Sequence, residues 1–341
     1  MLTEYMNKKW FGLVLLIITF LFLITFMTVG GVSAQPKEII MKVGYPMGAT
    51  PGHPHYHVGR YLQKRVEELT NGGVKVQLYP QSQLGGDRET MEGVMDGTIE
   101  MAWPDSAIIV LVVPEIGVLN VPYIFKDWDH ALRVLNGKVG RQLEAKCLAK
   151  GIRIGGWSFS GTRHIMTTKK PIYKLEDLKG IKIRVMETPI YIEMLKAWGA
   201  TPTPVAWPEV YMALAQGVVE GQETGIAAAI DMKHLEPIRY ISLTFDSIAI
   251  RTLIISEKWW QTLPSDVQAA ISKATSETTI MLNEKIREAE DQAVEIAKEK
   301  YKVTITKPDL GPFREAIRAI YPKFEKLVGG REIMELVLSV E

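Results

Sequence analysis

The segment that decides the fold is Gly180–Gly225, which reads GIKIRVMETPIYIEMLKAWGATPTPVAWPEVYMALAQGVVEGQETG. Its opening residues alternate in polarity, with Ile181, Ile183 and Val185 separated by basic side chains. Successive residues of a strand point to opposite faces, so this pattern predicts a strand that buries its aliphatic side chains. Arg184 then points the other way, toward a cleft or water. A lone arginine on such a strand is a candidate anion ligand.

The rest of the segment continues as a helix, a strand and a further helix. The helix is predicted from Pro189 to Trp198, the strand from Thr201 to Ala206, and the next helix begins at Pro208. The same alternation opens the chain, with predicted strands and helices at Ile39–Gly44, His55–Thr70, Val74–Tyr79, Arg88–Asp96 and Ile99–Trp103. Such repeated strand–helix alternation predicts an α/β fold with covered sheets.

Length points to two lobes and to a long helix near the C-terminus. Roughly 300 residues would remain after a leader, which exceeds the size at which one core usually stops growing. The stretch from Ser265 to about Tyr301 is rich in Glu, Lys and Ala and has few helix breakers. At 1.5 Å per residue it predicts a helix of about 55 Å, longer than one lobe.

The chain resembles the substrate-binding subunits of tripartite ATP-independent periplasmic (TRAP) transporters, of the DctP (C4-dicarboxylate-binding-like) type. The matching motifs are LKGIKIRV at 178–185, GATPTPVAWPEVYMALAQGVVEGQE at 199–223, YPQSQLGGDRE at 79–89, VPYIFKD at 121–127, GTRHIMTTKKPI at 161–172, LPSDVQ at 263–268 and KPDLGPF at 307–313. They occur in one order and cover essentially the whole chain after residue 35.

The resemblance implies a two-lobed periplasmic binding protein, a hinged clamshell whose long C-terminal helix spans both lobes. We expect lobe I to comprise residues 35–160 and about 249–288. Lobe II would then comprise residues 161–248 and about 289–341.

The N-terminus has the three parts of a secretory signal. Lys8 and Lys9 precede an apolar run from Trp10 to about Gly30, and a Val-Ser-Ala sequence ends at Ala34. We predict cleavage after Ala34 (signal peptide 1–34) and a periplasmic mature chain. An uncleaved anchor is the alternative, because the run approaches the roughly 20 residues that span a bilayer. No cysteine follows the run, which excludes lipid attachment there.

Composition excludes several kinds of partner and bond. Removal of residues 1–34 leaves 38 basic and 38 acidic side chains, so no bulk field favours nucleic acid or a membrane surface. Cys147 is the only cysteine, so no internal disulfide can form.

Arginine suits carboxylate recognition because its guanidinium stays charged and donates two parallel hydrogen bonds. By resemblance, Arg184 occupies the position of the ligand carboxylate clamp, and Arg163 matches a second site arginine. No acid lies within four residues of Arg163, so we expect it to add positive charge. The alternative for Arg163 is a surface salt bridge.

Further site residues follow from the resemblance. Trp207 matches an aromatic that closes over the ligand, and Trp103 and Asp105 match a pocket aromatic and acid on the first lobe. For both tryptophans, core packing is the alternative. Asp87 could reach the cleft, although a role as N-cap of the following helix would also explain it.

Three positions depart from the family pattern. Thr224 stands where an asparagine often follows Gln222-Glu223, and it offers one hydrogen-bond donor instead of two. Glu187 and Ile108 replace an asparagine and an arginine of sialic-acid binders, so sialic acid is not expected as the ligand. Glu187 could pair with Arg184 or accept hydrogen bonds from a hydroxy acid, and we favour the second role.

Catalytic and metal motifs are weak. His53, His55 and His57 resemble a metal-binding tract, but on a helix only the first and last share a face, and we predict no metal and no cofactor. Gly156-Trp157-Ser158-Phe159-Ser160 misses the nucleophile elbow at its last position. The sequence therefore contains no identifiable set of nucleophile and acid–base residues that would indicate an enzyme.

We interpret the chain as a solute-binding subunit that captures an organic acid by hinge closure. The resemblance implies a small and a large membrane subunit as partners, and a monomer is expected for a hinge that must open. A ligand sensor for a signalling receptor and a secreted enzyme are the alternatives. Four-carbon dicarboxylates, hydroxy or sugar acids and aromatic acids all stay open as ligands.

Overall fold

A computed structural model of the protein describes residues 38–48 and 54–341. The predicted signal segment, its cleavage after Ala34, and His53 lie outside the described residues. Residues 40–341 belong to one unit. Among the described residues, no helix combines the length and the apolar character needed to cross a bilayer.

The first half of the fold is built on five strands in the order β2-β1-β3-β9-β4. β1 and β3 are parallel, and β9 runs antiparallel to both β3 and β4. The bounds are β1 (Ile39–Gly44), β2 (Val74–Tyr79), β3 (Met101–Ala102), β4 (Ile152–Thr167) and β9 (Ile248–Ser256).

The second half extends the same sheet as β4-β7-β5-β6, and β8 pairs with both β4 and β10. β5 is parallel to β6 and β7, whereas β7 is antiparallel to β4. The bounds are β5 (Lys182–Val185), β6 (Thr201–Pro204), β7 (Gly221–Gly225), β8 (Tyr240–Ser242) and β10 (Thr304–Thr306).

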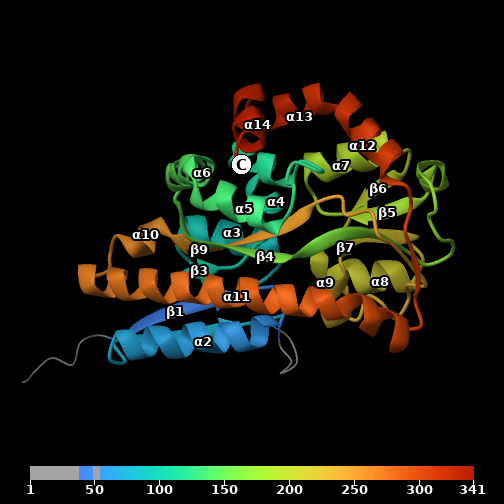
Figure 1. Cartoon of the computed structure of the whole chain (residues 1–341). Coiled ribbons are helices and arrows are strands. Elements are labelled where there is room, and N and C mark those ends of the chain that lie inside the picture. The colour runs from blue at the N-terminus through green and yellow to red at the C-terminus, as the bar shows by residue number, and fades with distance from the viewer. Residues whose placement is uncertain (1–37, 49–53) are drawn as a thin grey trace, which may run out of the picture. The chain divides into compact units, whose positions relative to one another are not determined.

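Helices cover both faces of this sheet (Figure 1). Those that accompany the first-half strands are α2 (Pro54–Leu69), α3 (Asp87–Asp96), α4 (Ser106–Ile109), η1 (Pro114–Asn120), α5 (Trp128–Asn136), α6 (Lys138–Leu148) and α10 (Glu257–Trp260). Those that accompany the second-half strands are η2 (Leu175–Leu178), α7 (Pro189–Ala197), η3 (Trp207–Glu209), α8 (Val210–Ala215) and α9 (Ile226–Asp231).

The predicted long helix is confirmed as α11 (Ser265–Glu299), which has 35 residues. It packs against α2 and β4, and farther along against α9 and β10, so it touches both halves of the fold (Figure 1). Ala293 and Ala297 of α11 enter the core of the second half, where they pack with residues such as Leu235 and Ile241. The small alanine side chains allow close approach of the helix to that core.

Three C-terminal helices complete the chain: α12 (Leu310–Ala319), α13 (Tyr321–Leu327) and α14 (Arg331–Leu338). α12 packs on α7 of the second half, whereas α14 packs on α6 and η1 of the first half. The last helices therefore bridge the two halves. The predicted lobe boundaries stay a prediction.

β4 belongs to both halves and changes partner within one strand. Residues up to Thr162 pair with β9, and residues from Arg163 onward pair with β7. The register shifts between Phe159 and Thr162, where Gly161 adopts a φ of +108°. Any side chain there would also meet Glu290 of α11, because an added Cβ would lie 2.6 Å from its Oε1 atom.

Most predicted elements agree with the structure, with two corrections. Asp87 is not an N-cap: α3 begins at Asp87 itself, Gly86 precedes it, and no side chain caps the helix. The strand predicted from Ile99 to Trp103 shortens to Met101–Ala102. Trp103 lies just beyond the end of β3, although its amide still donates to the carbonyl of Gly44 at 2.9 Å.

Candidate functional site

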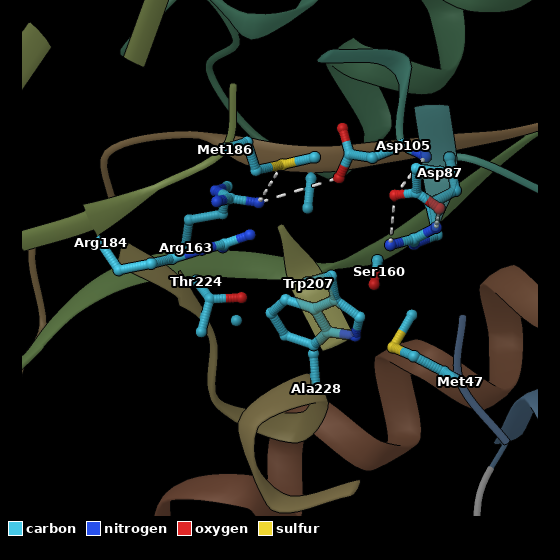
Figure 2. A pocket seen from close by; sticks show the side chains of 13 residues that line it. Met47, Asp87, Asp105, Ser160, Arg163, Arg184, Met186, Trp207, Thr224 and Ala228 are labelled. Carbon is cyan, nitrogen blue, oxygen red and sulfur yellow. Dashed lines mark hydrogen bonds and ion pairs between the residues drawn. The ribbon is translucent and has the colours of Figure 1, made fainter. Parts of the chain in front are cut away.

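A partly open cavity lies where β4, β5, β7 and β9 meet, and its volume of about 330 Å³ includes space that is open to solvent. Six of the eight predicted site residues line it: Arg184, Arg163, Trp207, Thr224, Asp105 and Asp87. Sequence reasoning missed the other lining residues: Met47, Ser160, Met186, Gly225, Ala228, Ala249 and Arg251. Figure 2 shows the two predicted arginines on one side of this cavity and the two aspartates on the other.

Arg184 projects from β5 into the cavity, on the face that its alternation predicts. Its side chain is only 1% exposed, and its Nε donates to the carbonyl of Val205 at 3.0 Å. The guanidinium carbon lies 5.3 Å from the ring centroid of Trp207, within cation–π range. Among the described residues, Nη1 has no hydrogen-bond partner. Arg184 therefore presents to the cavity a cation that forms no ion pair among the described residues.

The electrostatics of Arg184 favour an incoming anion. Burial, followed by the positive charge of Arg163, lowers the pKa of Arg184 to about 9. The guanidinium stays protonated at neutral pH, but its removal from water makes the charged form less favourable than in solution. A carboxylate in the cavity would offset that cost and satisfy the open donor.

Arg163, from β4, is neutralised by a residue distant in sequence. Its Nη2 donates to the carboxylate of Glu223 at 2.6 Å and to the carbonyl of Glu223 at 2.9 Å, and Nε bonds the same carboxylate. Asp105 lies farther away, 3.8 Å from Nη1, and the ring centroid of Tyr191 is 4.6 Å from the guanidinium. The expectation that Arg163 adds net charge is therefore wrong, because Glu223 pairs with it across the sheet.

The opposite wall carries Arg251, which sequence reasoning missed. Its Nη1 and Nη2 lie 3.3 and 3.4 Å from the two carboxylate oxygens of Asp87, and Nη1 donates to the carbonyl of Trp103 at 2.8 Å. Arg251 is the single charged residue of the buried strand IAIRTLIIS. This is the pattern that marked Arg184, so the signal was present in the sequence.

Asp105 stands beside this pair and caps α4. Its Oδ1 accepts from the amide of Ala107 at 2.9 Å, and its own amide donates to Asp87 at 3.3 Å. Burial raises the pKa of Asp105, while the nearby Arg251 and Arg163 charges oppose that shift. This wall therefore sets two carboxyl groups against one guanidinium.

Trp207 and Thr224 line the cavity as predicted, and both are buried. The indole Nε1 of Trp207 has no partner among the described residues, and its ring lies 4.7 Å from that of His234. Thr224 faces the same space from β7 (Figure 2). Both can offer a donor to a ligand beside Arg184.

Trp103 and Glu187 lie outside the cavity. Trp103 is a core residue behind it, where Nε1 donates to Ser158 at 3.0 Å, so its predicted role as a pocket aromatic is wrong. Glu187 is exposed and lines an adjoining depression together with Arg184 and Arg88. No ion pair joins Glu187 to Arg184 among the described residues.

Two of the three histidines of the tract, His55 and His57, lie among the described residues. His55 is buried against the edge of Trp103, whereas His57 is exposed. The described residues contain no group of three or more histidine, cysteine or acidic side chains arranged for a metal ion.

The two halves share one sheet and one long helix, and an arginine-lined cavity lies at their junction. These are the features of a solute-binding protein. The model of bacterial extracellular solute-binding proteins, family 7 (DctP), matches residues 46–327, and the chain belongs to this family.

Similar proteins and solved structures support this family assignment. The chain is 30% identical over 308 residues to the sialic acid-binding periplasmic protein SiaP of Vibrio cholerae, covering 90% of this chain and 94% of that protein. It is similar to a TRAP periplasmic solute-binding protein of Polaromonas bound to D-erythronate (TM-score 0.85, 30% identity, 89% and 99% of the chains). A third, from Sulfurospirillum deleyianum with bound succinate, has a TM-score of 0.83 at 32% identity, covering 89% and 99%.

Proposed function

We propose that the protein is the solute-binding component of a TRAP transporter, which captures an organic acid and delivers it to a small and a large membrane subunit. One observation carries this proposal: the buried guanidinium of Arg184 lines the cavity, and its Nη1 has no hydrogen-bond partner among the described residues. A free carboxylate is the group that best matches a charged, planar donor pair. The ligands bound in two solved relatives, D-erythronate and succinate, are carboxylates.

Capture occurs by closure of two lobes around the acid. The carboxylate docks on Arg184, while Thr224 and Trp207 offer further donors from the same side. The opposite wall, with Asp87 and Asp105, then closes over the rest of the ligand. Closure is driven only by the difference in affinity between the open and closed forms.

The lobes follow the boundaries expected from the sequence, 35–160 with about 249–288 and 161–248 with about 289–341. The change of partner on β4 at residues 162 and 163 supports the first boundary. The mature chain begins at Gln35 in the periplasm, after cleavage behind Ala34. The intact mass of the protein secreted by an expressing bacterium tests this start.

The protein acts by binding, without catalysing a reaction. In support, the cavity's charged groups other than Arg184 are engaged with one another, as in the pairs Arg163–Glu223 and Arg251–Asp87. Ligand sensing for a signalling receptor would use the same site. Co-purification of the two membrane subunits with the tagged protein distinguishes transport from sensing.

The proposal is tested by thermal unfolding of residues 35–341 against mono- and dicarboxylic, hydroxy, sugar and aromatic acids at millimolar concentration. A ligand at 1,000 times its dissociation constant stabilises the folded state by about 4 kcal/mol, which raises the midpoint by several degrees. A shift confined to one class of acids would support the proposal and name that class. A well-folded protein that no acid stabilises would refute it.

A further inference from the structure

The two walls of the cavity differ in charge. On the wall formed by β4, β5 and β7, Arg163 and Glu223 cancel, and Arg184 is a cation that forms no ion pair within the described part of the chain. Asp246 lies buried behind Glu223, and burial together with the Glu223 carboxylate raises its pKa well above the ordinary value. Asp246 does not line the cavity. The side chains that line it from this wall, taken with their ion-pair partners, carry one net positive charge.

On the opposite wall, the cation Arg251 is already in an ion pair with Asp87. Arg251 is held by both oxygens of Asp87, and its Nη1 also donates to the carbonyl of Trp103. Asp105 adds a second carboxyl group, which is neutral if protonated and negative if ionised. The wall is therefore neutral or carries one negative charge, and all three side chains are buried.

From this asymmetry we infer that the site selects an acid with one carboxylate and with hydroxyl groups at its far end over a dicarboxylate of the same length. The inference rests on the proposed function, because it assumes that a carboxylate docks on Arg184. It goes further by assigning specificity to Asp87 and Asp105. These two residues would contact the uncharged end of the ligand and accept hydrogen bonds from its hydroxyl groups.

The physical reason is the cost of a second buried charge. A carboxylate placed against the Asp87–Asp105 wall meets carboxyl oxygens, and Arg251 is already paired, so the repulsion is not compensated. A hydroxyl group can donate a hydrogen bond to either aspartate, whereas a carboxylate can only accept hydrogen bonds. Hydroxyl groups therefore satisfy this wall in a way that a carboxylate does not.

The test compares ligand pairs that differ only in their last carbon, by isothermal titration of residues 35–341. Suitable pairs are D-erythronate with meso-tartrate and galactonate with galactarate, in which a terminal CH₂OH becomes a carboxylate. We expect at least one monocarboxylate to bind at least about tenfold more tightly than its dicarboxylate partner, a difference of about 1.4 kcal/mol. A dicarboxylate that binds as tightly as, or more tightly than, its partner would overturn the inference and leave the proposed function standing.

Variants then assign the selectivity to residues. In Asp87→Asn, Arg251 loses its charged partner, so we expect the monocarboxylate preference to shrink several-fold. Asp105→Asn gives a second, independent reading should Asp87→Asn fail to fold. Glu335→Gln is the control, because this exposed carboxylate on α14 pairs with Arg331 and does not line the cavity, so it should leave the ratio unchanged. A preference that neither aspartate variant alters would overturn the assignment, and failure of every acid to bind would refute the proposed function itself.

Discussion

At the residue scale, the site depends on which buried charges have partners. Arg184 forms no ion pair with any residue that the structure describes, whereas Arg163 and Arg251 are paired with Glu223 and Asp87. Those partners lie 60 and 164 residues away in the sequence. Local sequence could reveal each arginine as an exception in an apolar strand. It could not reveal the partner, because the sheet order brings the pair together.

The ion pair of Arg163 and Glu223 predicts a large effect on stability. Replacement of Glu223 by Gln leaves the guanidinium buried without its counter-charge, and breaking a buried pair in this way costs about 3–5 kcal/mol. Denaturant unfolding of the ligand-free protein measures the loss. The matched control is Glu335→Gln, whose pair with Arg331 on α14 is exposed and should cost less than about 1 kcal/mol. Equal losses in the two variants would contradict the account of Arg163.

At the scale of elements, β4 is the strand that both halves share, and Gly161 is a constrained position within it. We expect Gly161→Ala to lower stability by more than the about 1 kcal/mol of backbone strain, since its Cβ would also meet Glu290. Gly180→Ala is the control, because Gly180 also has a positive φ of +77° but no atom within 4 Å of an added Cβ. Thermal unfolding compares the two. If Gly161→Ala loses no more stability than Gly180→Ala, the Glu290 side chain moves aside without cost, which would contradict the prediction.

Glu290 of α11 couples the long helix to this strand and gives it a pH dependence. Its carboxylate accepts from the amide of Thr162 at 2.9 Å and from that of Ala227 at 3.4 Å. Burial raises the pKa of Glu290 to about 7 despite these bonds, and Asp291 adds to the rise. Nearby Arg287 lies in an exposed pair with Asp129, at 2.8 Å.

Because the folded-state pKa lies above the unfolded value of 4.5, the folded protein binds a proton that the unfolded chain has released. The resulting stability is present below the unfolded pKa and is lost as pH rises through about 7. We expect the midpoint of the natural protein to fall relative to Glu290→Gln between about pH 5 and about pH 8. A difference between the two that stays constant over this range would contradict the assignment.

Secondary structure was predictable where the pattern was strong. β1 and β2 end where the alternation predicts, and α11 begins at the predicted Ser265. The strand at Ile99–Trp103 was too long in the prediction, since pairing with β9 covers only Met101 and Ala102. Apolar alternation reports burial on one face and does not report how many residues find a partner strand.

At the scale of the whole molecule, two halves joined by β4, α11 and the C-terminal helices enclose the cavity between residues of both. The fold class and the family followed from motifs along the chain. The position of α14 against α6 and η1 did not, because helix packing between distant segments leaves no local signal. The charge difference between the cavity walls likewise emerges only once the sheet is assembled.

The central claim is that Arg184 binds the carboxylate of an organic acid, and isothermal titration of Arg184→Ala tests it most directly. With the acid that stabilises the natural protein, we expect the variant to lose at least about 2 kcal/mol of binding free energy, or roughly thirtyfold in affinity. The control is Arg331→Ala, an exposed arginine on α14, which should bind as the natural protein does. Unchanged affinity in a well-folded Arg184→Ala variant would contradict the account.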